Sequence, residues 1–185
     1  MTPAQRKATA IALATAIAIP AEGLRRVVYY DPPSILTTCY GHTGADVVVG
    51  KVYSIAECKA LLDQDMLTAV NAVERCQPGL PPNVLAAFSD SVYNAGPTIA
   101  CNTIKSTAAR LLKAGNYKAA CEQLPNWNKS RILGVMVSLP GLTKRRAAEM
   151  KLCLTPEPAR PTAALVHYSW TEPKNEHTGY LKENA

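Results

Sequence analysis

Two carboxylates and one hydroxyl stand close together near the start of the chain. Glu22 is followed nine residues later by Asp31, and Thr37 comes six residues after Asp31. Hydrolysis of a glycosidic bond uses two carboxyl groups with separately tuned protonation states. One must hold a proton near neutral pH, which burial beside apolar side chains favours, while the other stays ionised. A hydroxyl can orient the attacking water. These three residues are therefore candidates for a glycosidase site.

The same residues also allow a purely structural interpretation. Carboxylates at this spacing are common, Glu22 could cap a helix or pair with Arg25 or Arg26, and Asp31 could simply begin a turn. The spacing by itself favours this structural interpretation, so the choice depends on the wider pattern.

The elements around these residues are predicted to bring them to one cleft. Glu22 lies at the end of a predicted helix, and residues 27–30 favour a strand. A turn at residues 31–34 leads to a return strand at residues 35–40, which indicates a small hairpin or a three-stranded sheet. Glu22, Asp31 and Thr37 can then face the same side of that sheet.

The remainder of the chain is predicted to be mainly helical. Ser54 and Glu57 form a capping box that opens a helix to about Arg75. Further helices are expected at residues 83–94 (ended by Gly96), 103–113, 117–124 and 142–154. The predicted fold class is α+β, with a small β-hairpin or sheet lobe and a mainly helical lobe.

The N-terminal 21 residues form an apolar segment. Arg6 and Lys7 precede a charge-free run at residues 8–21, which is short beside the roughly 20 residues of a stable membrane span. Three interpretations remain: a cleaved signal peptide, a weak anchor that later leaves the membrane, or a buried helix. The weak anchor is favoured, since cleavage near Ala21 would leave Glu22 as the new N-terminus.

Composition limits the partners and the compartment. The 185 residues fit one domain, and a net charge of +6 suits an anionic partner such as nucleic acid, an acidic membrane face or a cell wall. Nucleic acid is not expected, because zinc-ligand spacing, a Gly-rich phosphate loop and basic-aromatic interleaving are all missing. Six widely spaced cysteines predict disulfides in an oxidising compartment, with buried thiols as the alternative; they are Cys39, Cys58, Cys76, Cys101, Cys121 and Cys153.

The composition changes at residues 155–185, where prolines recur among scattered polar residues. A surface-hugging or disordered extension is expected there. His167, Tyr168 and Trp170 could form a binding patch, but a solvated tail without a function of its own is favoured.

The motif around the two carboxylates resembles one known family. Its parts are Glu22-Gly23-Leu24-Arg25, Tyr30-Asp31, Thr37 and Tyr40-Gly41-His42-Thr43. Together they closely resemble the phage-type lysozymes of glycoside hydrolase family 24. Further matches follow in chain order up to Leu154: Tyr93-Asn94-Ala95-Gly96, Gly115-Asn116-Tyr117, Trp127, Gly141-Leu142, Arg145-Arg146 and Glu149.

The resemblance implies a lysozyme-like fold and roles for the candidate residues. Glu22 would protonate the leaving oxygen, Asp31 would be the second carboxylate, and Thr37 would help to hold the attacking water. The substrate would be the β-1,4 bond between N-acetylmuramic acid and N-acetylglucosamine in peptidoglycan, and no metal or organic cofactor is implied. Where the family usually has Gly three residues after the Asp, this chain has Ser34, so a stiffer turn is expected.

Four other motif residues receive separate predictions. Tyr40 and His42 are expected to be structural hydrogen-bonding groups of the turn. Arg145 either binds anionic glycan or peptide carboxylates or pairs with carboxylates inside the protein, as does its neighbour Arg146.

The apolar N-terminus resembles that of signal-anchor-release endolysins, which are exported uncleaved, tethered inactive to the inner membrane and then released. This implies a monomer in the host periplasm that associates transiently with the membrane through residues 8–21. A disulfide switch from the anchor is excluded, since no cysteine precedes Cys39. The preferred pairing joins chain neighbours, although fifteen pairings are possible: Cys39–Cys58, Cys76–Cys101 and Cys121–Cys153.

The expected function is an endolysin muramidase for host cell lysis. Two alternatives stay open: a non-catalytic peptidoglycan-binding or structural module, and a virion-associated lysozyme used at entry. An intact set of Glu22, Asp31 and Thr37 disfavours the first, and the export-like N-terminus disfavours the second.

Overall fold

The computed structural model describes residues 1–31, 34–132 and 134–156. The expected extension at residues 155–185 therefore lies outside the described residues beyond Pro156. In chain order the elements are α1 (Pro3–Glu22), β1 (Arg25–Tyr30), β2 (Leu36–Cys39), β3 (His42–Thr43), α2 (Ile55–Cys76), α3 (Pro82–Ala95), α4 (Thr98–Cys101), α5 (Thr107–Lys113), α6 (Tyr117–Cys121), the short 3-10 helix η1 (Leu124–Trp127), β4 (Lys129–Ile132), β5 (Val135–Ser138) and α7 (Pro140–Leu154).

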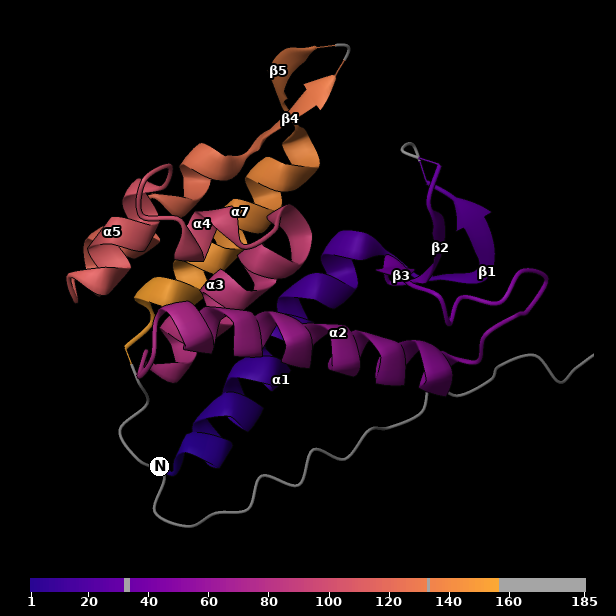
Figure 1. Cartoon of the computed structure of the whole chain (residues 1–185), viewed down its shortest axis with the longest axis horizontal. Coiled ribbons are helices and arrows are strands. Elements are labelled where there is room, and N and C mark those ends of the chain that lie inside the picture. Colours follow the sequence, from indigo (N-terminus) through magenta and orange to yellow (C-terminus); the bar gives the residue numbers. More distant parts are fainter. Residues whose placement is uncertain (32–33, 133, 157–185) are drawn as a thin grey trace, which may run out of the picture.

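The first helix is part of the helical lobe (Figure 1). A capping box between Thr2 and Gln5 opens α1, and Ala10, Ala14 and Ala18 are fully buried, four residues apart. Residues at this spacing share one helix face, and their small side chains allow α1 to pack closely against α2 and α3. In this conformation the N-terminal segment is the buried helix of the three interpretations. Within the described parts of the chain, no helix combines the length and apolarity required to span a membrane.

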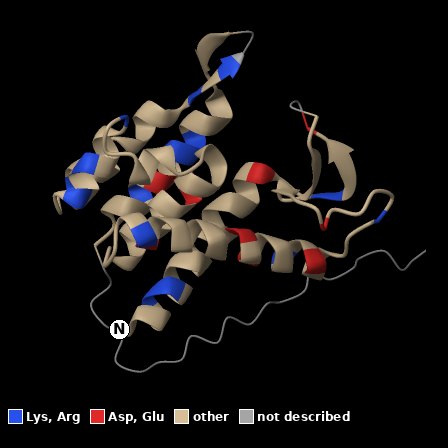
Figure 2. Cartoon of the chain, in the orientation of Figure 1, with Lys and Arg blue, Asp and Glu red and all other residues tan. Residues whose placement is uncertain are grey.

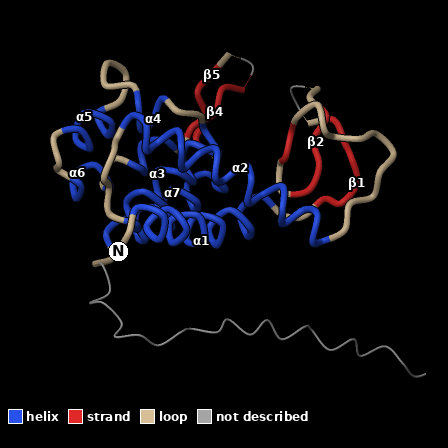
Figure 3. Tube along the Cα trace, turned by 60° about the horizontal axis from the view of Figure 1, so that its bottom comes forward, coloured by secondary structure: helices blue, strands red, loops and turns tan. Residues whose placement is uncertain are grey.

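The core of the helical lobe lies around α3, which the other helices surround (Figure 3). Every residue from Pro82 to Val92 except Asn83 is buried, so α3 is the central helix. The predicted helices at residues 55–75, 83–94 and 142–154 are confirmed, including the capping box between Ser54 and Glu57.

Two predicted helices have other bounds in the structure, and one hairpin was not predicted. The helix expected from residue 103 begins at Thr107, because the Asn102 carboxamide accepts hydrogen bonds from the backbone of Ile104 and Lys105 and Ser106 supplies the N-cap. The helix expected at residues 117–124 ends at Cys121 and is followed by η1. The hairpin of β4 and β5 was not predicted at all, because its exposed apolar residues lack a polar–apolar alternation.

The small lobe is the predicted three-stranded antiparallel sheet, in the order β1-β2-β3. Thr37 on the central strand lies opposite Tyr29 on β1 and Thr43 on β3. A separate small core of Cys39, Tyr53 and Cys58 fastens this sheet to α2.

All six cysteines are in disulfides, each joining neighbours along the chain as in the preferred pairing: Cys39–Cys58, Cys76–Cys101 and Cys121–Cys153. The first connects β2 to α2, and the last connects α6 to the end of α7. The disulfides therefore tie both lobes to the helices of the core.

Ser34 has a φ of 65°, in the left-handed region that favours glycine. This is the position where a glycine was expected from the family pattern. We predict that Ser34→Gly raises the free energy of unfolding by up to about 1 kcal/mol, because relief of the strain exceeds the entropy that glycine adds to the unfolded chain. Urea unfolding of the two proteins measures this difference, and a less stable glycine variant would contradict the prediction.

Candidate active site

Glu22 is the last residue of α1, and its side chain is held on one side only. Its Oε1 accepts a hydrogen bond from Arg145 Nη1 of α7. Its Oε2 faces Gly41, where an added Cβ would lie 3.6 Å from Oε2. The side chain is 24% exposed. One carboxyl oxygen is thus fixed by a cation, and the other has no hydrogen bond with the described residues and faces the turn after β2.

Arg145 fastens Glu22 to the centre of the molecule. Its Nε and Nη2 donate to the two oxygens of Asp90 at 2.9 and 2.8 Å, and Asp90 on α3 is fully buried. Burial alone would lower the pKa of Arg145, but the hydrogen bonds and charges of Asp90 and then of Glu22 outweigh it and raise this pKa. The guanidinium therefore stays charged and joins the end of α1 to the middle of α3 and to α7.

The acidic and basic residues of this network lie inside the helical lobe, where α7 crosses α3 (Figure 2). Burial raises the pKa of Glu149 to about 9, and Asp90 adds to the rise against the lowering by Arg146 and Arg145. Ser91 Oγ lies 2.7 Å from the Ala87 carbonyl and 3.1 Å from Glu149 Oε2. Arg146 Nη2 lies 2.9 Å from Glu149 Oε1, so this buried carboxyl group contacts both a hydroxyl and a guanidinium.

Asp31 and Thr37 are joined through one residue of the hairpin. The backbone N–H of Ile35 donates to Asp31 Oδ1 at 2.7 Å, and the Thr37 hydroxyl donates to the Ile35 carbonyl at 3.1 Å. The Asp31 N–H donates to the same carbonyl at 3.0 Å. Thr37 is buried, with 3% exposure. The two predicted residues are thus placed relative to each other, while Glu22 is placed by α7 and not by them.

The turn after β2 connects the sheet to the helical lobe beside Glu22. The Tyr93 hydroxyl of α3 donates to the Tyr40 carbonyl at 2.5 Å, and it lies 3.7 Å from the position of a Cβ on Gly41. Burial, and then the charges of Glu22 and Asp65, raise the pKa of Tyr93. His42 Nδ1 lies 2.8 Å from Asp65 of α2. His42 thus has the structural contacts that the sequence predicted, whereas Tyr40 takes part here through its backbone carbonyl.

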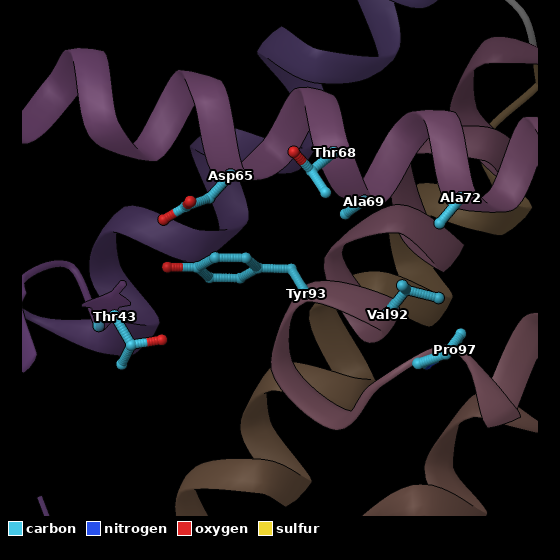
Figure 4. Close-up of a pocket in the computed structure, with 9 residues that line it drawn as sticks. Thr43, Asp65, Thr68, Ala69, Ala72, Val92, Tyr93 and Pro97 are labelled. Atoms are coloured by element: carbon cyan, nitrogen blue, oxygen red, sulfur yellow. The ribbon is translucent and has the colours of Figure 1, made fainter. Parts of the chain in front are cut away.

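A groove of about 360 Å³ opens between this turn, α2 and α3 (Figure 4). Gly41, which faces Glu22 Oε2, lines it together with Tyr93, whose hydroxyl also lies beside Gly41. The other lining residues are Thr43, Asp65, Thr68, Ala69, Ala72, Val92 and Pro97. The groove therefore reaches Gly41, which faces Glu22, and is lined by both polar and apolar groups. Glu22, Asp31 and Thr37, which the sequence placed in one cleft, are not among its lining residues.

The contacts of His42 predict a pH dependence of stability. Burial lowers its pKa, but the hydrogen bonds and charges of Asp65 and Asp46 outweigh burial and raise it above the usual 6.5. Because the folded pKa exceeds the unfolded one, the stabilisation is fully present below about pH 6.5 and is lost as pH rises through the raised value. Urea unfolding between pH 5.5 and 8.5 should show this decline, and His42→Gln should remove it. A parent whose stability rises across this window would contradict the assignment.

Sequence reasoning missed three parts of this arrangement: Asp90, Asp65 and Tyr93 as neighbours of the site. The sequence left two roles open for Arg145, namely binding of substrate carboxylates or pairing with carboxylates inside the protein. In the structure Arg145 pairs with carboxylates inside the protein. Tyr93 was marked by the motif that ends at Gly96, but nothing in that motif gave its contact with Tyr40.

Comparison with known proteins shows the family of the chain. The family model described as phage lysozyme matches residues 20–149. The SAR-endolysin of Bacteriophage PS119 is 38% identical over 134 residues, which cover 72% of this chain and 76% of the relative. The SAR-endolysin of Enterobacteria phage P21 is 34% identical over 168 residues, covering 83% and 98%.

Among solved structures, the muramidase domain of SpmX from Asticaccaulis excentricus superposes with a TM-score of 0.67. It is 28% identical and is matched over 80% of this chain and 95% of the other. A match to the family model over more than half of the sequence, together with relatives of this similarity, establishes the identity: the chain belongs to the phage lysozyme family.

Proposed function

We propose that this chain is an endolysin muramidase that hydrolyses the β-1,4 bond between N-acetylmuramic acid and N-acetylglucosamine in peptidoglycan. The observation that carries the proposal is the asymmetric setting of Glu22. Arg145 holds one oxygen, and the other faces Gly41, which lines the groove between the turn after β2, α2 and α3. Membership of the phage lysozyme family and similarity to muramidases and endolysins support it.

In this mechanism Glu22 is the general acid. Its Oε2 carries the proton and transfers it to the glycosidic oxygen as the bond to the leaving sugar breaks. Arg145 contacts only Oε1, so it can fix the carboxyl group without occupying the reacting oxygen. The buried Asp90 keeps Arg145 in place, which restricts the rotation of the acid.

Asp31 and Thr37 act on the opposite side of the bond in this proposal. Asp31 Oδ1 is engaged by the Ile35 N–H, which leaves Oδ2 to face the positive charge that develops on the sugar or to take a proton from water. The Thr37 hydroxyl donates to Ile35, so its remaining lone pairs can accept a hydrogen bond from that water. Their shared contact with Ile35 fixes the two groups relative to each other.

We further propose that the enzyme acts as a monomer in the host periplasm and first associates with the inner membrane through residues 8–21. The charge-free composition of that run and the SAR-endolysins among the relatives support this. Glu22 ends the helix that contains this run, so the acid reaches its place only when α1 packs into the helical lobe. Membrane fractionation of the full chain tests this step. Recovery of part of the protein with the inner membrane would support it, and recovery in the periplasmic fraction alone would contradict it.

A non-catalytic wall-binding module is the competing function. The products released from peptidoglycan distinguish this module from a muramidase. We expect the parent to release muropeptides from purified peptidoglycan that end in a reducing N-acetylmuramic acid, which borohydride converts to the alcohol. Binding without new reducing ends would support the module. Free peptides or anhydro-sugar ends would show that a different bond or reaction is involved.

A further inference from the structure

We propose that the β4–β5 hairpin binds the peptide stems of peptidoglycan and so selects stem-bearing glycan strands. The proposal rests on the proposed muramidase function, because it assigns a second part of the same substrate to a surface outside the catalytic groove. The hairpin consists of Lys129–Ile132 paired with Val135–Ser138.

The hairpin is exposed and carries two kinds of side chain. Val135 and Met136 are 63% and 53% exposed, and Val137 is 39% exposed. Lys129 and Arg131 are also exposed, and neither side chain has a hydrogen bond or an ion pair with the described residues. A two-stranded ribbon alone has little stability of its own. A patch of exposed apolar side chains on such a ribbon favours a binding role.

The register places the two cations together. Lys129 lies opposite Ser138 and Arg131 lies opposite Met136, so both cationic positions are on one face of the ribbon. Two positive charges two residues apart, beside an apolar side chain, suit a short ligand with carboxylates and small apolar groups. The peptide stems of peptidoglycan have this chemistry, with free carboxylates and alanine methyl groups, whereas the N-acetylglucosamine units are neutral.

The base of the hairpin is fixed to the helix that positions the catalytic acid. The Leu139 N–H donates to the Asn128 carbonyl at 3.0 Å, and the Asn128 side chain donates to Thr143 Oγ1 at 3.1 Å. Arg145, which holds Glu22, lies five residues into α7 from Pro140, a rise of about 8 Å along the helix axis. The ribbon therefore has a rigid connection to the catalytic centre.

The direction in which the β4–β5 hairpin projects also fits a substrate that extends from the groove. The β4–β5 hairpin and the three-stranded sheet both project to the same side of the molecule in two views, with the end of α1 between them in the first (Figures 1 and 3). Basic residues are present on this projecting ribbon (Figure 2). A glycan strand between the two projections would present its stems to the hairpin.

The test compares two substrates and two double variants. Lys129→Ala with Arg131→Ala removes the cations of the hairpin. Lys105→Ala with Lys113→Ala is the matched control, because it removes the same charge from exposed positions at α5 and before it. The substrates are purified sacculi and the same glycan freed of its peptides by an amidase.

On sacculi we expect the hairpin variant to raise KM about three- to tenfold with kcat little changed, as the loss of two exposed charge contacts implies. On stem-free glycan the hairpin variant should match the parent, which also shows that it is folded. The control pair should match the parent on both substrates. Equal effects on both substrates, or no effect on sacculi, would overturn the proposal.

A membrane-binding role is the other outcome to be distinguished. If the hairpin variant lost binding to vesicles containing phosphatidylglycerol while its KM on sacculi stayed parental, the ribbon would be a lipid contact and the proposal would fail. A parent that released no reducing ends from either substrate would instead overturn the muramidase function itself.

Discussion

Replacement of Arg145 by glutamine should both destabilise the fold and remove most of the activity. Asp90 is fully buried, and both of its oxygens accept hydrogen bonds from Arg145. Breaking a buried pair by removing one partner typically costs about 3–5 kcal/mol, because the remaining charge is left uncompensated. We therefore expect a loss of this size in the free energy of unfolding, measured with urea.

The same substitution removes the only side-chain hydrogen bond that Glu22 has with the described residues. Displacement of a catalytic group by about 1 Å can lower the rate about 100-fold, and we expect at least this loss in kcat under conditions where the variant is folded. Arg145→Lys should recover only part of either property, since an ammonium cannot contact both carboxyl groups as a planar fork does. Arg110→Gln, at an exposed cation with only local contacts, serves as the control. Full stability or full activity of Arg145→Gln would contradict this role.

Removal of the Cys121–Cys153 disulfide should have the second-largest effect on stability. It closes the longest of the three disulfide loops, with a separation of 32 residues, and both cysteines are buried. The chain-entropy relation gives about 4 kcal/mol for a loop of this length. We expect a loss near this value for Cys121→Ala with Cys153→Ala, measured by urea unfolding without reductant.

The effect on activity should be smaller than for Arg145, because Cys153 lies at the far end of α7 from the acid. After full reduction with a thiol, the parent should lose more stability than the double variant does, since only the parent still has this disulfide to lose. If the free energy of unfolding of the double variant fell by less than about 1 kcal/mol, the disulfide would not stabilise the fold by restricting the conformations of the unfolded chain.

Local signals predicted most of the fold. The capping box of Ser54 and Glu57 marked the start of α2, and Gly96 marked the end of α3. The turn that begins at Asp31 marked the hairpin of the small sheet. The buried face of α1 was not predictable from residue type, because the buried Ala10, Ala14 and Ala18 alternate with exposed alanines along a run without charges.

The candidate site was predictable only in part, for reasons of distance along the chain. The Glu22–Arg145 contact joins residues 123 positions apart, and the Asp90–Arg145 contact joins residues 55 apart. The sequence marked Glu22 and Arg145 through the motif resemblance, but which groups they contact depends on how α1, α3 and α7 pack. The roles of Glu22, Asp31 and Thr37 in catalysis stay predictions.

The most direct test of the central claim is the release of reducing ends from purified peptidoglycan by the parent and by Glu22→Gln. Glutamine has the same shape and its carboxamide oxygen can still accept from Arg145, so the fold should be kept, but it has no acidic proton to give. We predict that kcat falls by about 1,000-fold while the unfolding transition stays parental. A Glu22→Gln variant that is folded and releases reducing ends at the parental rate would contradict the assignment of Glu22 as the general acid.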